Sequence, residues 1–157
     1  MSQLLGSQLT EELFHRLRGE SMAKKGKAIV IVTIDETGWP HPGMLSYSEV
    51  VAKDRSTIDL AIGKSSTTAK NLRRSGKITL LITDSDLNYY VKGDARELKE
   101  SIEDVSFMSL FRVTVAHLLE DLEPDAVITS GVMFERAPKK EIEELVDKIY
   151  QAVRREP

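Results

Sequence analysis

Four hydroxyl-bearing residues in a row form the part of this sequence best suited to binding chemistry: Ser65, Ser66, Thr67 and Thr68. They follow an apolar run that ends at Gly63 and precede a short basic segment that ends at Gly76. This order predicts a strand, a turn, a helix over residues 66–75 and a second strand. The first turn of a helix has backbone N–H groups without partners, and its dipole favours negative charge. The turn is therefore a candidate site for an anion such as a phosphate.

The same residues also have a simpler explanation. Ser and Thr are preferred at helix N-caps in the absence of any ligand, where a cap contributes about 1 kcal/mol. The basic residues around the turn fit either a solvated helix face or charge neutralisation of a phosphate; they are Lys64, Lys70, Arg73, Arg74 and Lys77. The residues alone leave both interpretations open.

Other chemistries find little support. The three histidines lie at positions 15, 41 and 117 without a metal-ligand spacing, so we expect no metal site. There is no cysteine, which excludes thiolate zinc sites, iron–sulfur clusters and thiol nucleophiles. No G-x-S-x-G motif indicates a serine nucleophile. Aromatic residues could stack on a planar ring or pack in a core or interface, and Tyr47 is the best placed of them.

Composition limits the class of protein. A chain of 157 residues is long enough for one domain with one core. A formal net charge of −3 gives no case for binding nucleic acid or an anionic membrane. The first residues do not have the pattern of a signal peptide, and the apolar runs are too short to cross a bilayer. We therefore expect a cytoplasmic protein.

The elements that must position the hydroxyl turn follow from periodicity and turn residues. Within a single domain over 1–157, residues 1–27 predict a helix (10–18) and a loop, 28–134 a β core, and 138–155 an amphipathic helix. Gly93 predicts a bulge, and the prolines at 40 and 42 predict an edge position. Residues 101–108 predict a partly helical connection. The predicted strands are 28–34, 44–52, 57–62, 78–83, 87–98, 110–119 and 126–134, which favour a mainly antiparallel α+β barrel or sandwich with peripheral helices.

Several short patterns follow one another within this core. A glycine-bearing turn leads to a proline at the start of the second strand, GWPHP at residues 38–42. The hydroxyl turn precedes the helical pattern A-K-N-L-R-R-x-G at residues 69–76, and YVKGDA at residues 90–95 contains a G-x-A step. In this order, over residues 28–134, the patterns resemble the pyridoxamine 5′-phosphate oxidase-like, FMN-binding split β-barrel family.

This resemblance implies a six- or seven-stranded antiparallel split β-barrel that forms a homodimer and binds flavin mononucleotide (FMN) between its subunits. In the family, the flavin phosphate lies against the turn before the short helix, which here implies Ser65, Ser66, Thr67 and Thr68, with Lys64 or Lys70 as a nearby cation. The isoalloxazine ring lies along the second and third strands, which implies a slot formed by Met44, Leu45, Ser46, Tyr47, Ala61, Ile62 and Gly63.

The sequence also departs from the oxidase. By alignment, Gly43 and Ser48 stand where the oxidase has an arginine and a lysine that hold the cofactor, and the arginine-rich C-terminal substrate segment has no counterpart. We therefore expect no pyridoxamine phosphate oxidase activity. The first hypothesis is an FMN-dependent oxidoreductase of unknown substrate. The alternative is a non-catalytic ligand-binding or regulatory dimer of the same fold, without firmly bound flavin or with another planar ligand such as a deazaflavin or haem.

Overall fold

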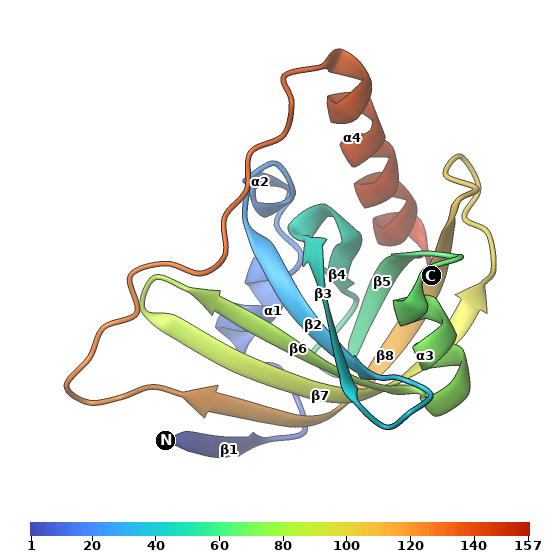
Figure 1. Ribbon diagram of the computed structural model, residues 1–157. Helices are drawn as coiled ribbons and strands as arrows, with labels where there is room; N and C mark the ends of the chain where they lie inside the picture. Colours follow the sequence, from blue (N-terminus) through green and yellow to red (C-terminus); the bar gives the residue numbers. More distant parts are fainter.

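The computed structural model describes residues 1–157 and contains one antiparallel sheet that curls into a split β-barrel (Figure 1). The hydrogen-bonded order is β3-β2-β6-β7-β8-β5-β4, and β1 pairs with the end of β8. The predicted α+β split barrel is confirmed, with eight strands in place of six or seven. The strands are β1 (Ser2–Gly6), β2 (Ala28–Ile34), β3 (Pro40–Ser46), β4 (Val50–Ala52), β5 (Thr57–Gly63), β6 (Lys77–Asp84), β7 (Leu87–Lys99) and β8 (Met108–Asp121).

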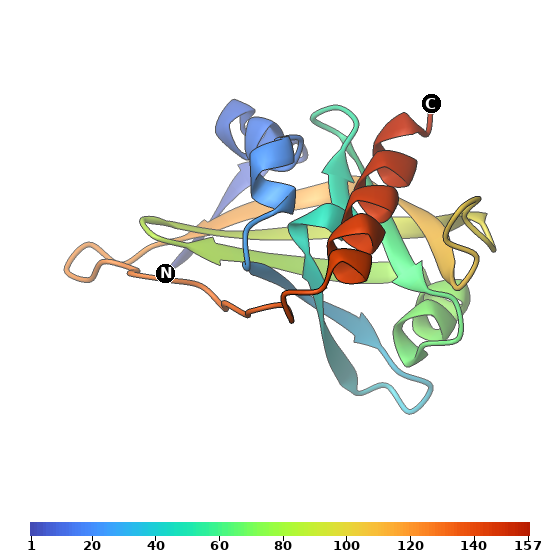
Figure 2. The ribbon, with the colours of Figure 1, turned by 90° about the horizontal axis from the view of Figure 1, so that it is seen from above.

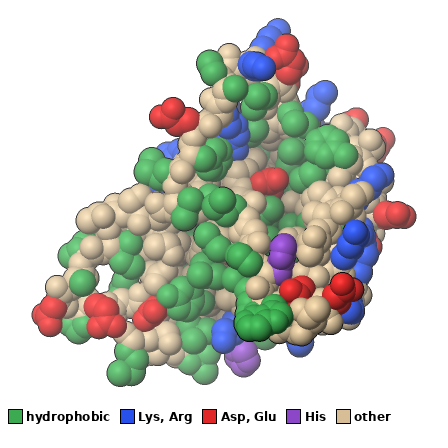
Figure 3. All heavy atoms as spheres, viewed as in Figure 1, with side chains coloured by type: hydrophobic (Ala, Val, Ile, Leu, Met, Phe, Trp, Pro, Cys, Tyr) green, Lys and Arg blue, Asp and Glu red, His purple; other side chains and the backbone are tan.

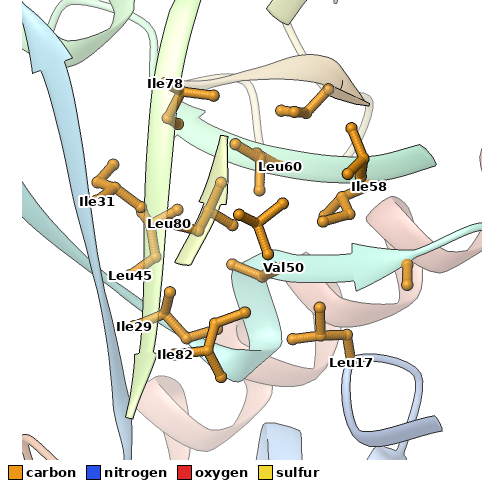
Figure 4. Packing of buried hydrophobic residues seen from close by; sticks show 14 of the residues in the cluster. Leu17, Ile29, Ile31, Leu45, Val50, Ile58, Leu60, Ile78, Leu80 and Ile82 are labelled. Carbon is orange, nitrogen blue, oxygen red and sulfur yellow. The ribbon is translucent and has the colours of Figure 1, made fainter. Parts of the chain in front are cut away.

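Alternation of apolar side chains along the strands fills the inside of the barrel. On β2, Ile29 and Ile31 are fully buried, and they meet Leu80 and Ile82 of the neighbouring β6. Figure 4 shows these side chains pointing toward one another, together with Leu45, Val50, Ile58 and Leu60 from the other strands. This core fixes the registers that bring the candidate site together.

The helices lie at the ends and on one side of the sheet (Figures 1 and 2). They are α1 (Glu11–Arg16), α2 (Glu20–Ala23), α3 (Thr67–Ser75) and α4 (Lys140–Arg155). Thr10 caps α1 by accepting a hydrogen bond from the Leu13 N–H at 3.1 Å. No helix is long and apolar enough to cross a membrane.

A second, smaller apolar cluster joins α4 to the outer side of β4, β5 and β8. Its members from α4 are Ile149, Tyr150 and Val153, and they cover Ala61 of β5. The Tyr150 hydroxyl also donates a hydrogen bond to the Arg18 carbonyl at 2.9 Å. The amphipathic helix predicted at the C-terminus therefore packs on its own barrel.

Several local predictions hold in detail. β2 has the predicted bounds, and β3 with its prolines forms one edge of the sheet, where missing N–H groups cost least. The pairing of β7 with β8 shifts between Lys92 and Gly93, as expected for a bulge. A Cβ at Gly93 would lie 2.4 Å from Val113 Cγ1, so this close strand approach requires glycine.

The predicted strand over 44–52 is wrong in its middle, because a 3₁₀ turn, η1 (Tyr47–Glu49), separates β3 from β4. A capping box causes the break: the Glu49 carboxylate accepts hydrogen bonds from the backbone N–H and the hydroxyl of Ser46, at 2.6 and 3.1 Å. The chain can thus turn from one edge strand of the split barrel to the other.

The last predicted strand, 126–134, is also wrong. Residues 122–139, which we call the strap, run without regular structure from the end of β8 past the ends of β6 and β2 to α4 (Figure 1). A single bridge joins Lys27 to Met133, and the only other backbone bonds to the sheet region are isolated ones, such as Ala28 N–H to the Val132 carbonyl at 3.0 Å. The sequence is β-prone, but it meets only the ends of strands and finds no edge to pair with.

Smaller differences lie at the ends of the chain and in one hairpin. Of the predicted partly helical connection 101–108, residues 101–107 form turns with an isolated bridge between Ile102 and Val105, and Met108 already belongs to β8; there is no helix. The loop predicted at 19–27 contains α2, and β1 at the N-terminus was not predicted. All five residues of β1 are exposed, and the strand pairs with β8, so its sequence has no alternation of buried and exposed residues that could reveal it.

Candidate functional site

The hydroxyl turn adopts the predicted geometry at the start of α3. Ser66 is the N-cap, and its Oγ accepts a hydrogen bond from the Ala69 N–H at 3.1 Å. Lys70 N–H is the first donor to close a helical turn, onto the Ser66 carbonyl at 3.1 Å, so the N–H groups of Thr67 and Thr68 have no partner within the helix. The hydroxyls of Ser65 and Thr67 belong to exposed residues. The turn thus offers two backbone donors and two accessible hydroxyls.

Buried polar contacts fix α3 to the sheet. Asn71 Nδ2 donates to Thr33 Oγ1 of β2 at 3.0 Å, and both residues are almost completely buried. Arg74 donates to Asn71 Oδ1 at 3.2 Å and to the Ile34 carbonyl. Gly76 then ends the helix in the left-handed conformation, with φ of 67°, where glycine carries no Cβ penalty. The first turn of α3 is therefore held in a defined place on β2.

Some of the cations near this turn are held by hydrogen bonds to the protein, and others are not. Arg73 forms a two-pronged pair with Glu97 at 3.0 and 2.6 Å and also donates to the Lys64 carbonyl and Ser109 Oγ. The hydrogen bond to Glu97 raises the pKa of Arg73, and the same bond lowers the pKa of Glu97. Arg73 and Arg74 are therefore structural ties. Lys70 is exposed, and no side-chain hydrogen bond or ion pair engages it.

β3 approaches the hydroxyl turn at Gly43. A Cβ built on Gly43 would lie 3.5 Å from Thr68 Oγ1, so this strand and the turn are in contact distance. The next residue, Met44, points to the opposite face of the strand and is 64 % exposed. Two separate predicted groups of residues, one on β3 and one at α3, are thus neighbours in the fold.

The remaining predicted slot residues face other directions. The side chains of Leu45, Tyr47 and Ile62 lie in the barrel core, and that of Ala61 lies under α4. The Tyr47 hydroxyl accepts a hydrogen bond from Arg16 Nε at 2.9 Å, and burial raises the pKa of Tyr47. These buried side chains are not available to a ring on the surface of the sheet, so only the backbone of these residues could contact it. Gly63 is half-buried beside Ser66, with a built Cβ 3.8 Å from Ser66 Cβ.

Met44 and Ser46 open onto a cavity of about 480 Å³. Its walls are the end of β3, η1, the strap and the inner face of α4. Eleven of its fifteen lining residues are hydrophobic, and the polar ones are Ser46, Ser48, Glu49 and Arg136. Burial raises the pKa of Glu49, against the effect of the Ser46 hydrogen bonds.

Sequence reasoning did not find the cavity residues of the strap and α4. The spacing of Ile142, Leu145 and Val146 shows an apolar helix face, but it does not show what that face covers. Phe134 and Arg136 were placed in or beside a strand that does not form, and no sequence pattern marks them.

Beside the cavity, the outer face of the sheet is unusually apolar. Met44, Val30 and Leu81 stand in line across β3, β2 and β6, because their registers pair them directly. Ile34 and Trp39 at the β2–β3 end are also exposed, at 37 % and 71 %. Hydrophobic side chains gather over this region in Figure 3. A contiguous apolar patch on the surface is typical of a site that binds a ligand or another protein.

Comparison with known proteins adds three findings. The family profile described as pyridoxamine 5′-phosphate oxidase matches residues 20–140. The uncharacterized protein YclD of Bacillus subtilis (strain 168) is 30 % identical over 136 residues, which cover 85 % of this chain and 88 % of YclD. Among solved structures, HupZ of Group A Streptococcus is similar with a TM-score of 0.57 at 17 % identity, covering 78 % of this chain and all of HupZ.

A Lactobacillus delbrueckii structure, named as a candidate pyridoxamine 5′-phosphate oxidase, superposes with a TM-score of 0.59 at 17 % identity. It covers 75 % of this chain and 98 % of its own. At such identities these two structures establish the shared fold, while the profile match over most of the chain establishes common descent.

Proposed function

The chain belongs to the pyridoxamine 5′-phosphate oxidase family, and we propose that it is a cytoplasmic, homodimeric member that binds FMN and serves as an oxidoreductase. One observation carries the proposal: the donor-rich first turn of α3 meets β3 at Gly43, so a phosphate and a planar ring could be held side by side.

The residues fit the phosphate in donor chemistry. Two backbone N–H groups without helical partners and the hydroxyls of Ser65 and Thr67 surround a helix N-terminus, the arrangement that favours bound phosphate. Lys70 is free to supply a cation from the next turn, whereas Arg73 is held by Glu97. The proposed roles are therefore phosphate binding by the turn and charge neutralisation by Lys70.

β3 is the edge strand of the sheet, so the ring would pass around this edge at Gly43 and lie on the outer face of β3, over Met44 and toward Ser46. Flavin supplies hydride or electron transfer when bound, and the protein supplies binding, orientation and exclusion of water. Met44 offers a flexible, polarizable surface for a planar ring. Ser46 and Ser48, whose hydroxyl oxygens are 2.6 Å apart, stand at the far end as hydrogen-bonding groups.

The apolar outer face of β2, β3 and β6 supports the proposed dimer, because a second copy would cover this face and enclose a ring lying on β3. Sedimentation at micromolar concentration should then give a dimer. A monomer throughout would contradict this part of the proposal.

The proposal is tested by the visible spectrum of the purified protein and by titration with FMN, followed by quenching of flavin fluorescence. Saturable quenching is expected, and the double variant Ser65→Ala, Thr67→Ala, which removes the two accessible hydroxyls and keeps the Ser66 N-cap, should bind FMN at least tenfold more weakly. Lys77→Gln removes a nearby cation that pairs with Asp94 and should leave the affinity unchanged. A colourless protein that quenches no flavin at high micromolar concentration would refute FMN binding.

A second candidate function is a ligand-binding or regulatory dimer without firmly bound FMN. It is favoured by the uncharged residues Gly43 and Ser48 and by the engagement of Arg73 and Arg74 elsewhere. A deazaflavin or haem would be an alternative planar ligand, and the same titration with each ligand distinguishes them. Pyridoxamine phosphate oxidase activity is not proposed, because the basic residues that the oxidase uses are replaced.

A further inference from the structure

The cavity between α4 and the end of β3 is not explained by flavin binding alone. The ring proposed above reaches this cavity only at its β3 side, whereas most of the lining residues belong to the strap and to α4. Its volume of about 480 Å³ lies in the range of small-molecule sites, about 300–1,000 Å³. It therefore has room for a ligand of its own.

The walls are apolar on both sides. β3 and the strap contribute Met44, Met133 and Phe134, and α4 contributes Ile142, Leu145 and Val146. Met133 is 65 % exposed and Met44 is 64 % exposed, although both side chains border the cavity. Methionine side chains adapt to ligands of different shape, so these walls suit a hydrocarbon or aromatic body.

Arg136 is the one cation of the cavity. Its guanidinium carbon lies 4.6 Å from the centre of the Phe134 ring, which orients the planar group. The side chain forms no ion pair and no hydrogen bond with the protein, and the residue is half-buried. A guanidinium in this state has its donors available for a carboxylate, which it can hold with two parallel hydrogen bonds.

The one carboxylate of the cavity is already engaged. Glu49 accepts the Ser46 N–H and hydroxyl hydrogen bonds of the capping box and forms no ion pair with Arg136. Burial raises the pKa of Glu49, and the Ser46 hydrogen bonds and the nearby charge of Arg136 act against this effect. Ser46 in turn shares a hydrogen bond with Ser48. Arg136 is therefore the one polar side chain of the cavity without a hydrogen-bond partner in the protein.

We propose that this cavity binds an apolar carboxylic acid, with its body between α4 and β3 and its carboxylate on Arg136. The proposal rests on the proposed function in one respect: Met44 borders both places, so the bound acid would lie next to the proposed ring. Binding of the acid needs no flavin, so the two proposals can fail separately.

The experiment compares octanoate with 1-octanol, two probes that differ mainly in the charged group, by calorimetric titration of the full chain. The wild type should bind octanoate at least tenfold more tightly than octanol, because a charge-assisted pair is lost with the alcohol. Arg136→Gln should reduce this preference to about one and leave the octanol affinity unchanged. Lys140→Gln, which removes an exposed cation outside the cavity at the start of α4, should keep the preference.

Two further variants separate the causes. Val146→Glu places a charge in the apolar wall and should abolish binding of both probes. The double variant Ser65→Ala, Thr67→Ala should bind octanoate as the wild type does, even where it weakens FMN binding. Failure of the wild type to bind octanoate at millimolar concentration, or an equal effect of Arg136→Gln on both probes, would overturn the assignment, and circular dichroism confirms that each variant is folded.

Discussion

The strap, which forms one wall of the cavity, contacts the chain at Gly26, just before β2, and one added methyl group can break this contact. A Cβ added to Gly26 would lie 2.1 Å from the Phe134 carbonyl oxygen, whereas ordinary contacts begin at 3.4 Å. The neighbour is backbone, which no rotamer change can move. Gly26→Ala must therefore separate the two segments by at least about 1.3 Å, the difference of these distances.

The separation breaks two backbone hydrogen bonds. Phe134 N–H donates to the Gly26 carbonyl at 2.9 Å, and Ala28 N–H donates to the Val132 carbonyl at 3.0 Å. At about 1 kcal/mol each, their loss lowers the free energy of local opening by about 2 kcal/mol. This corresponds to about a thirtyfold loss of amide protection, with 1.4 kcal/mol for each factor of ten.

Hydrogen exchange measured by NMR on the folded protein tests this prediction residue by residue. Protection of the Phe134 and Ala28 amides should fall about thirtyfold, while Val91 and Leu118 in the middle of the sheet should keep theirs. Octanoate binding should weaken in parallel, because Phe134 and Arg136 move with the strap. Gly63→Ala serves as the control, since its Cβ would be 3.8 Å from the nearest atom.

Unchanged protection at Phe134 in Gly26→Ala would refute the reasoning, because it would mean that the strap does not approach Gly26 as described. Loss of protection across the whole sheet would also refute it, since the strap would then be a part of the global fold.

Two further predictions concern ion pairs that hold the barrel. Asp59 on β5 is fully buried, and both of its carboxylate oxygens pair with Arg112 of β8, at 2.7 and 2.8 Å. Arg112→Ala leaves this buried charge without a partner and should lower the free energy of unfolding, measured in urea, by about 3–5 kcal/mol. A loss of less than about 1 kcal/mol would contradict this prediction. The Asp84 carboxylate accepts hydrogen bonds from both Arg16 and Lys27. Burial acts to raise the pKa of Asp84, but its hydrogen bonds to Lys27, the Ser85 N–H and Arg16 outweigh burial and lower the pKa below the ordinary 3.8. The stability from Asp84 should therefore be present above about pH 4 and decline as the pH falls through its lowered pKa, and Asp84→Asn should lose that part of the pH dependence of the unfolding free energy.

Elements with strong local signals could be predicted from the sequence. β2 is an uninterrupted β-branched run, and α3 has a serine cap at one end and a glycine stop at the other, so both were predicted almost to the residue. Such signals act over a few residues and need no knowledge of what packs against them.

The failures have two different causes. Whether residues 126–134 form a strand depends on a free sheet edge, which no local pattern reports. The break at η1 does have a local signal, the S-x-x-E capping box from Ser46 to Glu49, which the strand prediction missed. The candidate site shows the first, non-local kind of cause. The hydroxyl turn could be predicted because its four residues are consecutive in the sequence. Arg136 could not, because only the path of the strap brings it to the cavity.

The position of α4 connects these points to function. By covering Ala61 and the outer side of β5, the helix removes that strand from the surface on which a ring could lie, so β3 remains as the accessible one of the two predicted strands. The same helix face, further toward its N-terminus, forms the wall of the cavity next to β3. A single amphipathic helix thus covers one of the two strands predicted to hold the ring and forms a wall of the cavity beside the other. If Val146→Glu abolishes octanoate binding and leaves the FMN titration unchanged, the two roles of α4 are separable, and the proposed acid is recognised by the C-terminal helix and the strap more than by the barrel.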